Sequence, residues 1–185
     1  MQVTSTEIPG VLIVEPKVFG DARGFFFESF NQKAFDAAVG APVTFVQDNH
    51  SRSAKGVLRG MHLQADPHAQ GKLVRVTSGS VFDVAADIDP HSPTYRRWVG
   101  VELSADNHRQ MWIPAGLAHG FLVLSDRAEV QYKCSNVYNA ATEFGIQWDD
   151  AELAVAWPLG NEAPVISDRD RKNQSFADFR RKLTA

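Results

Sequence analysis

The sequence has almost no cysteine, no long hydrophobic run and no excess of one charge. A single cysteine, Cys134, cannot form a disulfide within the chain, which suits a cytoplasmic protein. No apolar run approaches the roughly 20 residues that cross a bilayer. Residues 1–7 lack the basic and apolar segments of a secretory signal, so none is expected. The 19 basic and 22 acidic side chains leave a net charge of −3, so we expect neither nucleic acid nor membrane as a partner.

What is present is the composition of an ordinary globular protein, with 44% hydrophobic and 22% charged residues. A chain of 185 residues can bury one substantial core. No repeat, low-complexity tract or linker divides it, so we predict a single domain over residues 1–185.

Short runs rich in Val, Phe, Trp and Tyr, separated by turn-forming residues, predict strands over most of residues 8–148. In residues 80–88, apolar side chains alternate with Asp83 and Asp87, which is typical of a half-buried strand with its acidic side chains toward solvent. Residues 119–124 predict a more deeply buried strand. Many short strands must close on themselves or cover their edges, so we predict an all-β barrel, sandwich or jelly roll.

Helical signals are few and lie at the two ends of the chain. Asn31 can cap a short helix that ends at Gly40, and Ser175 can cap another over residues 176–183. Both are expected to be peripheral to the strands.

Polar residues interrupt apolar strands near the middle of the chain. Arg59 and His62 lie within residues 57–64, and Lys72 opens the next apolar run. A buried charge or imidazole costs free energy unless it is paired or used, so the group indicates a functional site. Strict alternation would place Arg59 and His62 on opposite faces of a strand. We expect a bulge at Gly60 to bring them to one face.

A Pro-x-Gly-x-x-His turn then delivers His119 to the start of a strand. Together with the upstream strand that carries His62, this looks like the cupin superfamily of jelly-roll barrels. Metal-binding cupins use two close histidines, an acid and a later histidine. Here Gln64 and Lys72 follow His62, and a lysine would repel a divalent cation, so we expect no metal. His68 remains as a further possible ligand.

The chain resembles the dTDP-4-dehydrorhamnose 3,5-epimerase family, whose members make the dTDP-6-deoxy-L-sugar precursor of rhamnose. The resemblance runs nearly end to end. It rests on ordered motifs that would each be weak alone: residues 21–28 (DARGFFFE), 47–51 (QDNHS), 56–62 (GVLRGMH), 70–74 (QGKLV), 113–121 (IPAGLAHGF), 132–133 (YK), 146–150 (IQWDD) and 167–170 (SDRD).

The resemblance implies an isomerase without a cofactor, which converts dTDP-4-dehydro-6-deoxy-D-glucose to dTDP-4-dehydro-L-rhamnose. A 4-keto group acidifies the protons on both flanking carbons, so one general base can invert both centres. His62 matches that base, Asp170 matches the carboxylate that orients it, and Tyr132 matches the acid on the other face of the sugar. Lys72 is the candidate cation for the developing enolate oxygen.

The substrate-binding residues follow from the same resemblance. Arg59 and His119 are expected to hold sugar or phosphate oxygens, and Tyr138 to stack on the thymine ring. The other residues expected to line the nucleotide-sugar site are Arg23, Glu28, Gln47, Asn49, Glu143 and Arg169.

The resemblance also implies a homodimer in which N-terminal segments extend to the partner. Phe25, Phe26 and Phe27 are consecutive, so their three rings cannot all face one core in a strand. We expect one ring to meet a partner subunit; the alternative is a helix that covers the second face.

Three alternatives remain open at this stage. A related enzyme could epimerise a single centre of a similar dTDP-4-keto-6-deoxy sugar. A metal-dependent cupin would contain a stoichiometric metal. A non-catalytic sugar-nucleotide-binding protein would bind dTDP without exchanging protons.

Overall fold

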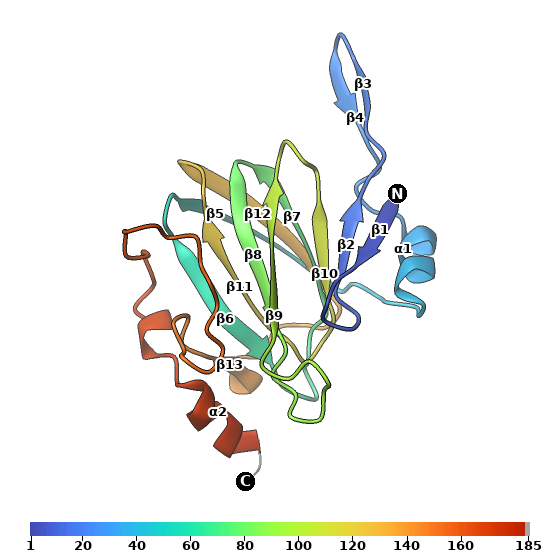
Figure 1. Ribbon diagram of the computed structural model, residues 1–185. Helices are drawn as coiled ribbons and strands as arrows, with labels where there is room; N and C mark the ends of the chain where they lie inside the picture. Colours follow the sequence, from blue (N-terminus) through green and yellow to red (C-terminus); the bar gives the residue numbers. More distant parts are fainter. Residues whose placement is uncertain (184–185) are drawn as a thin grey trace.

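The protein folds as two antiparallel β-sheets that pack face to face (Figure 1). The computed structural model describes residues 1–183. The larger sheet has six strands, in the order β1 (Gln2–Ser5), β2 (Leu12–Glu15), β10 (Gln110–Ile113), β7 (Lys72–Ser78), β12 (Arg127–Cys134) and β5 (Gln47–Ala54). The smaller has five, in the order β13 (Glu143–Gly145), β6 (Leu58–Gln64), β11 (Ala118–Val123), β8 (Ser80–Ala86) and β9 (Trp98–Ser104). The predicted all-β fold is confirmed.

An apolar core lies between the two sheets. Val74 and Val130 of the six-stranded sheet belong to the same buried cluster as Val81 and Phe121 of the five-stranded sheet. Every second residue of a strand points to one face, so each of these strands contributes alternate side chains to the core.

The C-terminal segment covers the outer face of the five-stranded sheet (Figure 1). Phe176 and Phe179 of helix α2 (Phe176–Leu183) are buried in one cluster with Val84 and Leu122 of that sheet. The Ser175 hydroxyl accepts a hydrogen bond from the amide of Asp178, as the predicted cap requires. Two short 3-10 helices, η1 (Ala140–Thr142) and η2 (Asp170–Lys172), complete this side of the molecule.

Helix α1 (Gln32–Val39) covers part of the outer face of the six-stranded sheet. The Asn31 side chain accepts from the amide of Ala34, and Gly40 ends the helix in the left-handed region with φ 82°, as predicted. Phe35 packs with Trp112 in a separate buried cluster. Within residues 1–183, neither helix is long and apolar enough to span a membrane.

The five-stranded sheet is therefore covered on both faces, and this corrects the interpretation of β8. Asp83 and Asp87 were expected to face solvent, yet both are buried. The face of β8 that carries Phe82 and Val84 packs under the C-terminal segment, so Asp83 points into the space between the sheets. The side chains of β8 do alternate between its two faces, as the sequence indicated. Both faces are buried, however, one between the sheets and the other under the C-terminal segment.

The N-terminal hairpin of β3 (Phe19–Asp21) and β4 (Gly24–Phe26) forms a separate two-stranded sheet that projects from the body of the protein (Figure 1). We call residues 19–26 the arm. Phe19 and Phe26 lie opposite each other across the arm and are 55% and 70% exposed. Because so much of the Phe26 side chain is exposed, the alternative of a helix that covers the second face is wrong.

Candidate active site

A cavity of about 910 Å³ lies between the two sheets and is bounded by the segment before η2. Of the thirteen residues that the sequence indicated, the eleven that line this cavity are Gln47, Asn49, Arg59, His62, Lys72, His119, Tyr132, Tyr138, Glu143, Arg169 and Asp170. These residues come from distant parts of the chain, and the fold brings them to one site.

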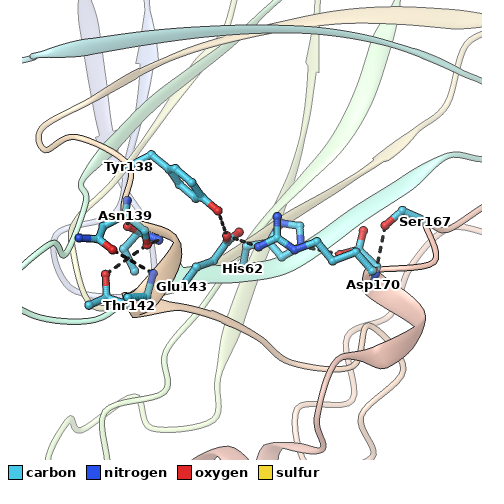
Figure 2. Close-up of polar contacts among 10 residues, drawn as sticks. His62, Tyr138, Asn139, Thr142, Glu143, Ser167 and Asp170 are labelled. Atoms are coloured by element: carbon cyan, nitrogen blue, oxygen red, sulfur yellow. Dashed lines mark hydrogen bonds and ion pairs between the residues drawn. The ribbon is translucent and has the colours of Figure 1, made fainter.

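Asp170 holds His62 in place at one wall of the cavity (Figure 2). His62 Nε2 lies 2.6 Å from Asp170 Oδ1, and the Asp170 amide donates to the hydroxyl of Ser167. Burial raises the pKa of Asp170, but the hydrogen bonds from His62, Ser167 and the Gly60 backbone, together with the charge of His62, bring the pKa below its ordinary value. An ionised carboxylate only accepts hydrogen bonds, so Nε2 carries the hydrogen and Nδ1 is left to take a proton.

A bulge in β6 brings Arg59 to the cavity beside His62, as predicted. His119 of β11 pairs with His62, whereas Phe121, two residues on, pairs with Arg59, three residues back. β6 thus has one extra residue at this point. Gly60 is required there: its φ is 129°, and a Cβ would lie 2.5 Å from the Cα of Gly120.

Tyr132 lies on the other wall, because β12 belongs to the six-stranded sheet and β6 to the five-stranded sheet. Its ring centroid is 6.4 Å from that of His119. Burial raises the pKa of Tyr132 above its ordinary value of 10.0, so the phenol stays protonated at neutral pH and can donate a proton.

Lys72 opens β7 and presents a cation to the same cavity. Burial lowers the pKa of Lys72 below its ordinary value, while the neighbouring Cys134, Asp83 and Glu143 act in the opposite direction. A cation in such a water-poor site interacts strongly with any negative charge that develops nearby.

Asp83 was missed as a site residue by the sequence reasoning. Its Oδ1 lies 2.8 Å from Nε2 of His119, and both side chains are buried. Burial lowers the pKa of His119, and the nearby Lys72 and His62 lower it further, against the opposing effect of Asp83. Neutral His119 then donates from Nε2 and can accept a hydrogen bond at Nδ1. The available signal was an acidic residue in the middle of an apolar strand.

Tyr138 and Glu143 form a polar cluster at the cavity (Figure 2), and Arg169 is its third member. The Tyr138 hydroxyl donates to Glu143 Oε2 over 2.6 Å, and the Arg169 guanidinium pairs with the same carboxylate. The hydrogen bond to Glu143 raises the pKa of Tyr138. About half of Tyr138 is exposed, which leaves its ring available to a planar ligand.

Gln47 and Asn49 connect this cluster to the interior. Gln47 Oε1 accepts from the amide of Tyr138 over 2.9 Å, and Gln47 Nε2 donates to Asn49 Oδ1 over 3.1 Å. Asn49 Nδ2 donates in turn to the sulfur of Cys134, which pairs with Lys72 across the strands. The position of Tyr138 is thus coupled to the wall that carries Lys72.

Arg23 and Glu28 do not line the cavity of their own chain. Arg23 lies at the turn of the arm, where its side chain is 90% exposed and pairs with Asp21. Glu28 lies at the base of the arm. A single chain therefore brings together eleven of the predicted residues and leaves these two outside.

The described part of the chain, residues 1–183, contains no group of three or more His, Cys, Asp or Glu side chains that could hold a metal ion. His62 and His119 each pair with a carboxylate, and the partly buried Lys72 lies near His119. His68 interacts with Asn139 and not with the cavity histidines. This donor set does not resemble the ligands of a cupin metal site.

A family model described as dTDP-4-dehydrorhamnose 3,5-epimerase matches residues 5–178. The chain belongs to this family. The predicted resemblance is therefore confirmed, and with it the class of enzyme, an epimerase. The epimerase of this name from Shigella flexneri is 61% identical over 178 residues, which cover 96% of this chain and 97% of the relative.

Solved structures from the family also match over the whole fold. The dTDP-6-deoxy-D-glucose-3,5-epimerase of Legionella pneumophila, in complex with dTDP-4-keto-L-rhamnose, matches with a TM-score of 0.93 and 48% identity, over 98% of this chain and 96% of its own. The 3'-monoepimerase ChmJ of Streptomyces bikiniensis, in complex with dTDP-quinovose, matches with a TM-score of 0.90 and 34% identity, over 96% and 89%.

Proposed function

We propose that this member of the epimerase family converts dTDP-4-dehydro-6-deoxy-D-glucose to dTDP-4-dehydro-L-rhamnose, a step of dTDP-L-rhamnose biosynthesis. One observation carries the mechanism: His62 and Tyr132 lie on opposite walls of one cavity. Inversion of a carbon requires that a proton leave from one face and that another arrive on the opposite face. A base and an acid on facing sheets meet this requirement.

His62 removes the proton at C3 and at C5, which both flank the 4-keto group. Its Nδ1 is the nitrogen that accepts the proton, because Nε2 is bonded to Asp170. The imidazolium that forms is stabilised by the Asp170 carboxylate, as in other pairs of base and orienting acid. One base can serve both carbons, because the same ketone acidifies both.

Lys72 lowers the cost of forming the enolate. A ketone α-proton is far less acidic than an imidazolium, and a mismatch of about ten pKa units costs about 14 kcal/mol. The partly buried Lys72 side chain places a positive charge in the cavity where negative charge develops on the C4 oxygen. Such preorganised charge is the main way in which enzymes stabilise transition states of this kind.

Tyr132 then returns a proton from the other wall. Because burial raises its pKa, the phenol is fully protonated at neutral pH, and the enolate carbon receives the proton on the face opposite His62. His62 then releases its proton to solvent and Tyr132 regains one. Repetition of the two steps at the second carbon completes the conversion from the D to the L configuration.

The remaining cavity residues bind the nucleotide sugar. Arg59 offers a guanidinium to phosphate oxygens, while neutral His119 accepts a hydrogen bond from a sugar hydroxyl at Nδ1. Tyr138 stacks on the thymine ring. The other lining residues in this proposal are Gln47, Asn49, Glu143 and Arg169.

The active unit that we propose is a homodimer in which the arm of each chain completes the site of its partner. Arg23 is exposed at the tip of the arm and lies outside its own cavity, as does Glu28. The exposed Phe19 and Phe26 give the arm an apolar face that a second copy can cover. The cytoplasmic location and the single domain stay predictions.

The activity is tested by incubating the protein with dTDP-4-keto-6-deoxyglucose in deuterium oxide and following the label by NMR. Label at both C3 and C5 supports the proposal. Because the fold also matches a 3'-monoepimerase, label at C3 alone would assign the chain to single-centre epimerases. Loss of exchange on chelation would favour a metal-dependent cupin, and dTDP binding without exchange a non-catalytic protein.

The acid is tested with Tyr132→Phe. This variant is expected to retain exchange at the first carbon and to lose inversion, because the base is intact and the opposing proton donor is missing. A variant that forms L-product at the wild-type rate would remove Tyr132 from this role.

The homodimer is tested by complementation between two impaired variants, assayed at a substrate concentration at which Arg23→Ala alone has little activity. His62→Ala removes the base of its own chain, and Arg23→Ala removes only the arm residue. A mixed dimer of the two has one intact site, so random pairing restores about a quarter of the wild-type sites. Restored activity supports sites completed by the partner; no restoration would place Arg23 outside the partner's site.

A further inference from the structure

The direction of the arm depends on side-chain contacts with the body of the protein, because the arm belongs to neither large sheet. Its two strands pair only with each other and join neither large sheet. An isolated two-stranded hairpin is at best marginally stable in water. An arm that delivers a side chain to a second subunit must nevertheless point in one direction, because a small displacement of a binding group weakens its contact.

One such contact is made by His108, from the turn between β9 and β10. The ring centroids of His108 and Phe25 are 4.8 Å apart, and those of His108 and Phe27 are 4.9 Å apart. Phe25 and Phe27 point to the same side of the chain and stack at 5.8 Å. His108 thus contacts Phe25 of β4 and Phe27, the residue after β4, while Phe26 between them points to the other side of the chain.

The turn that carries His108 is firmly braced. The side chain of Asn107 accepts from the amides of Ser104 and Arg109, at 3.0 and 2.9 Å, and donates to the carbonyl of Glu102 at 2.9 Å. His108 itself has φ 55°, in the left-handed region that few residues with a side chain adopt. These hydrogen bonds hold the backbone on both sides of His108 in one conformation.

The same turn is bound to the strand that leads into the arm. Arg109 Nε donates to Glu15 Oε1 over 2.6 Å, and Glu15 is the last residue of β2. The turn therefore contacts the chain at two points, at the end of β2 and at β4. These two contacts define the direction of the arm relative to the six-stranded sheet.

We propose that His108 is a positioning residue that fixes the direction of the arm and so places Arg23 in the cavity of the partner subunit. This inference rests on the proposed homodimer. His108 lies outside the cavity and touches none of the proton-transfer groups. Its loss therefore weakens substrate binding in the partner's site and leaves the chemical step intact, which appears in KM and not in kcat.

The first experiment isolates the ring with three variants assayed on the 4-keto sugar nucleotide. His108→Asn removes the ring but keeps a residue that tolerates the left-handed region. It is expected to raise KM about tenfold with kcat within about twofold of wild type. His108→Phe restores a ring and is expected to recover most of the affinity. His91→Asn, at an exposed histidine of the β8–β9 loop, is the matched control with wild-type constants.

The second experiment locates the effect with co-expressed, differently tagged chains. In the first mixed dimer, one chain carries both His62→Ala and His108→Asn and the other carries Arg23→Ala. The one intact site then receives its arm from the chain that lacks His108. In the second mixed dimer, one chain carries His62→Ala and the other carries both Arg23→Ala and His108→Asn. The intact site then receives its arm from the chain that retains His108. The proposal expects a raised KM in the first dimer only.

Three results would overturn the inference while the wild-type protein remains an active epimerase. The first is a wild-type KM in His108→Asn, and the second is a loss of kcat in this variant without a change in KM. The third is a raised KM in the second mixed dimer, in which His108→Asn lies on the chain that contains the intact site. Failure of the proposed function is a separate result, because it appears as inactivity of the wild-type protein. Amide exchange of residues 19–26 is expected to accelerate in His108→Asn in either case.

Discussion

Two histidine–aspartate pairs occur in the cavity, and their geometry is nearly the same. His62 pairs with Asp170 at 2.6 Å and His119 pairs with Asp83 at 2.8 Å, each through Nε2. They differ in access: the His62 side chain is 28% exposed and the His119 side chain 7%. The same two residue types therefore offer a proton acceptor open to the cavity in one case and a buried neutral imidazole in the other.

The carboxylates differ as well. Burial raises the pKa of Asp170, but its hydrogen bonds and the nearby His62 together keep this pKa below its ordinary value. In the described residues, Asp83 Oδ2 is buried and has no hydrogen-bond partner. Asp170 can therefore stabilise a protonated His62. The pKa of His119 is lowered by burial, and to a smaller degree by the neighbouring Lys72 and His62, which disfavours its protonated form. Access and neighbouring charge, more than the pair itself, decide which histidine acts as the base.

The most severe test of this difference replaces each histidine by asparagine. His62→Asn is expected to reduce kcat by about 10³-fold or more and to abolish exchange at both carbons, because the base is gone. His119→Asn is expected to retain label at both carbons and to raise KM. Rates and label are measured by NMR in deuterium oxide. Equal losses in the two variants would remove the distinction between the pairs.

A smaller effect is expected when the carboxylates are changed. Asp170→Asn removes the charge that stabilises the His62 imidazolium, and kcat is expected to fall about 10²-fold or more. Asp83→Asn leaves the base intact, so its main effect is expected on KM. Steady-state kinetics give kcat and KM of both variants relative to the wild type, and circular dichroism checks that both variants are folded. A larger loss of kcat in Asp83→Asn would reverse our assignment.

The protonation of His119 can be observed directly. Burial and the nearby positive groups lower the pKa of its imidazole, so His119 is expected to titrate below its ordinary value of 6.5. NMR titration of labelled histidine, with the signal assigned from His119→Asn, measures this. The Lys72→Met variant removes one of the neighbouring charges, and the pKa of His119 is expected to rise in it. A pKa above 6.5 in the wild type would contradict a neutral acceptor.

The smallest effects concern stability in acid, where the two pairs act in different pH windows. The folded-state pKa of His119 is lowered, so its contribution is complete above pH 6.5 and is lost as the pH falls from 6.5 toward the folded value. The pKa of Asp170 is also lowered, so its contribution is complete above pH 3.8 and is lost below it. The free energy of unfolding is measured with urea at several pH values. The loss of stability that begins below pH 6.5 is expected to be smaller in His119→Asn, and the loss below pH 3.8 is expected to be smaller in Asp170→Asn.

The fold and most of the site could be predicted because they depend on local patterns and on ordered motifs. The helix caps at Asn31 and Ser175 were readable from single residues, since capping depends on the first helical turn alone. The bulge near Gly60 followed from the need to bring Arg59 and His62 to one face, and the register of β6 against β11 confirms it.

What the sequence did not reveal depends on contacts between distant elements. Asp83 was assigned to solvent because alternation does not tell which layer covers the second face of a strand. That layer is the C-terminal segment, whose placement is a property of the whole fold. Likewise, motifs placed Arg23 among the site residues, but only the structure shows that it lies outside its own cavity.

The close approach of Gly60 and Gly120 has a consequence for altering this enzyme. Two facing positions without side chains let β6 and β11 come together where the extra residue is accommodated, and this sets the angle between Arg59 and His62. A single methyl group at position 60 would push the strands apart and turn the imidazole away from the sugar. Variants of the pocket should therefore retain Gly60 and Gly120, because the orientation of the His62 imidazole depends on the absence of a Cβ at these two positions.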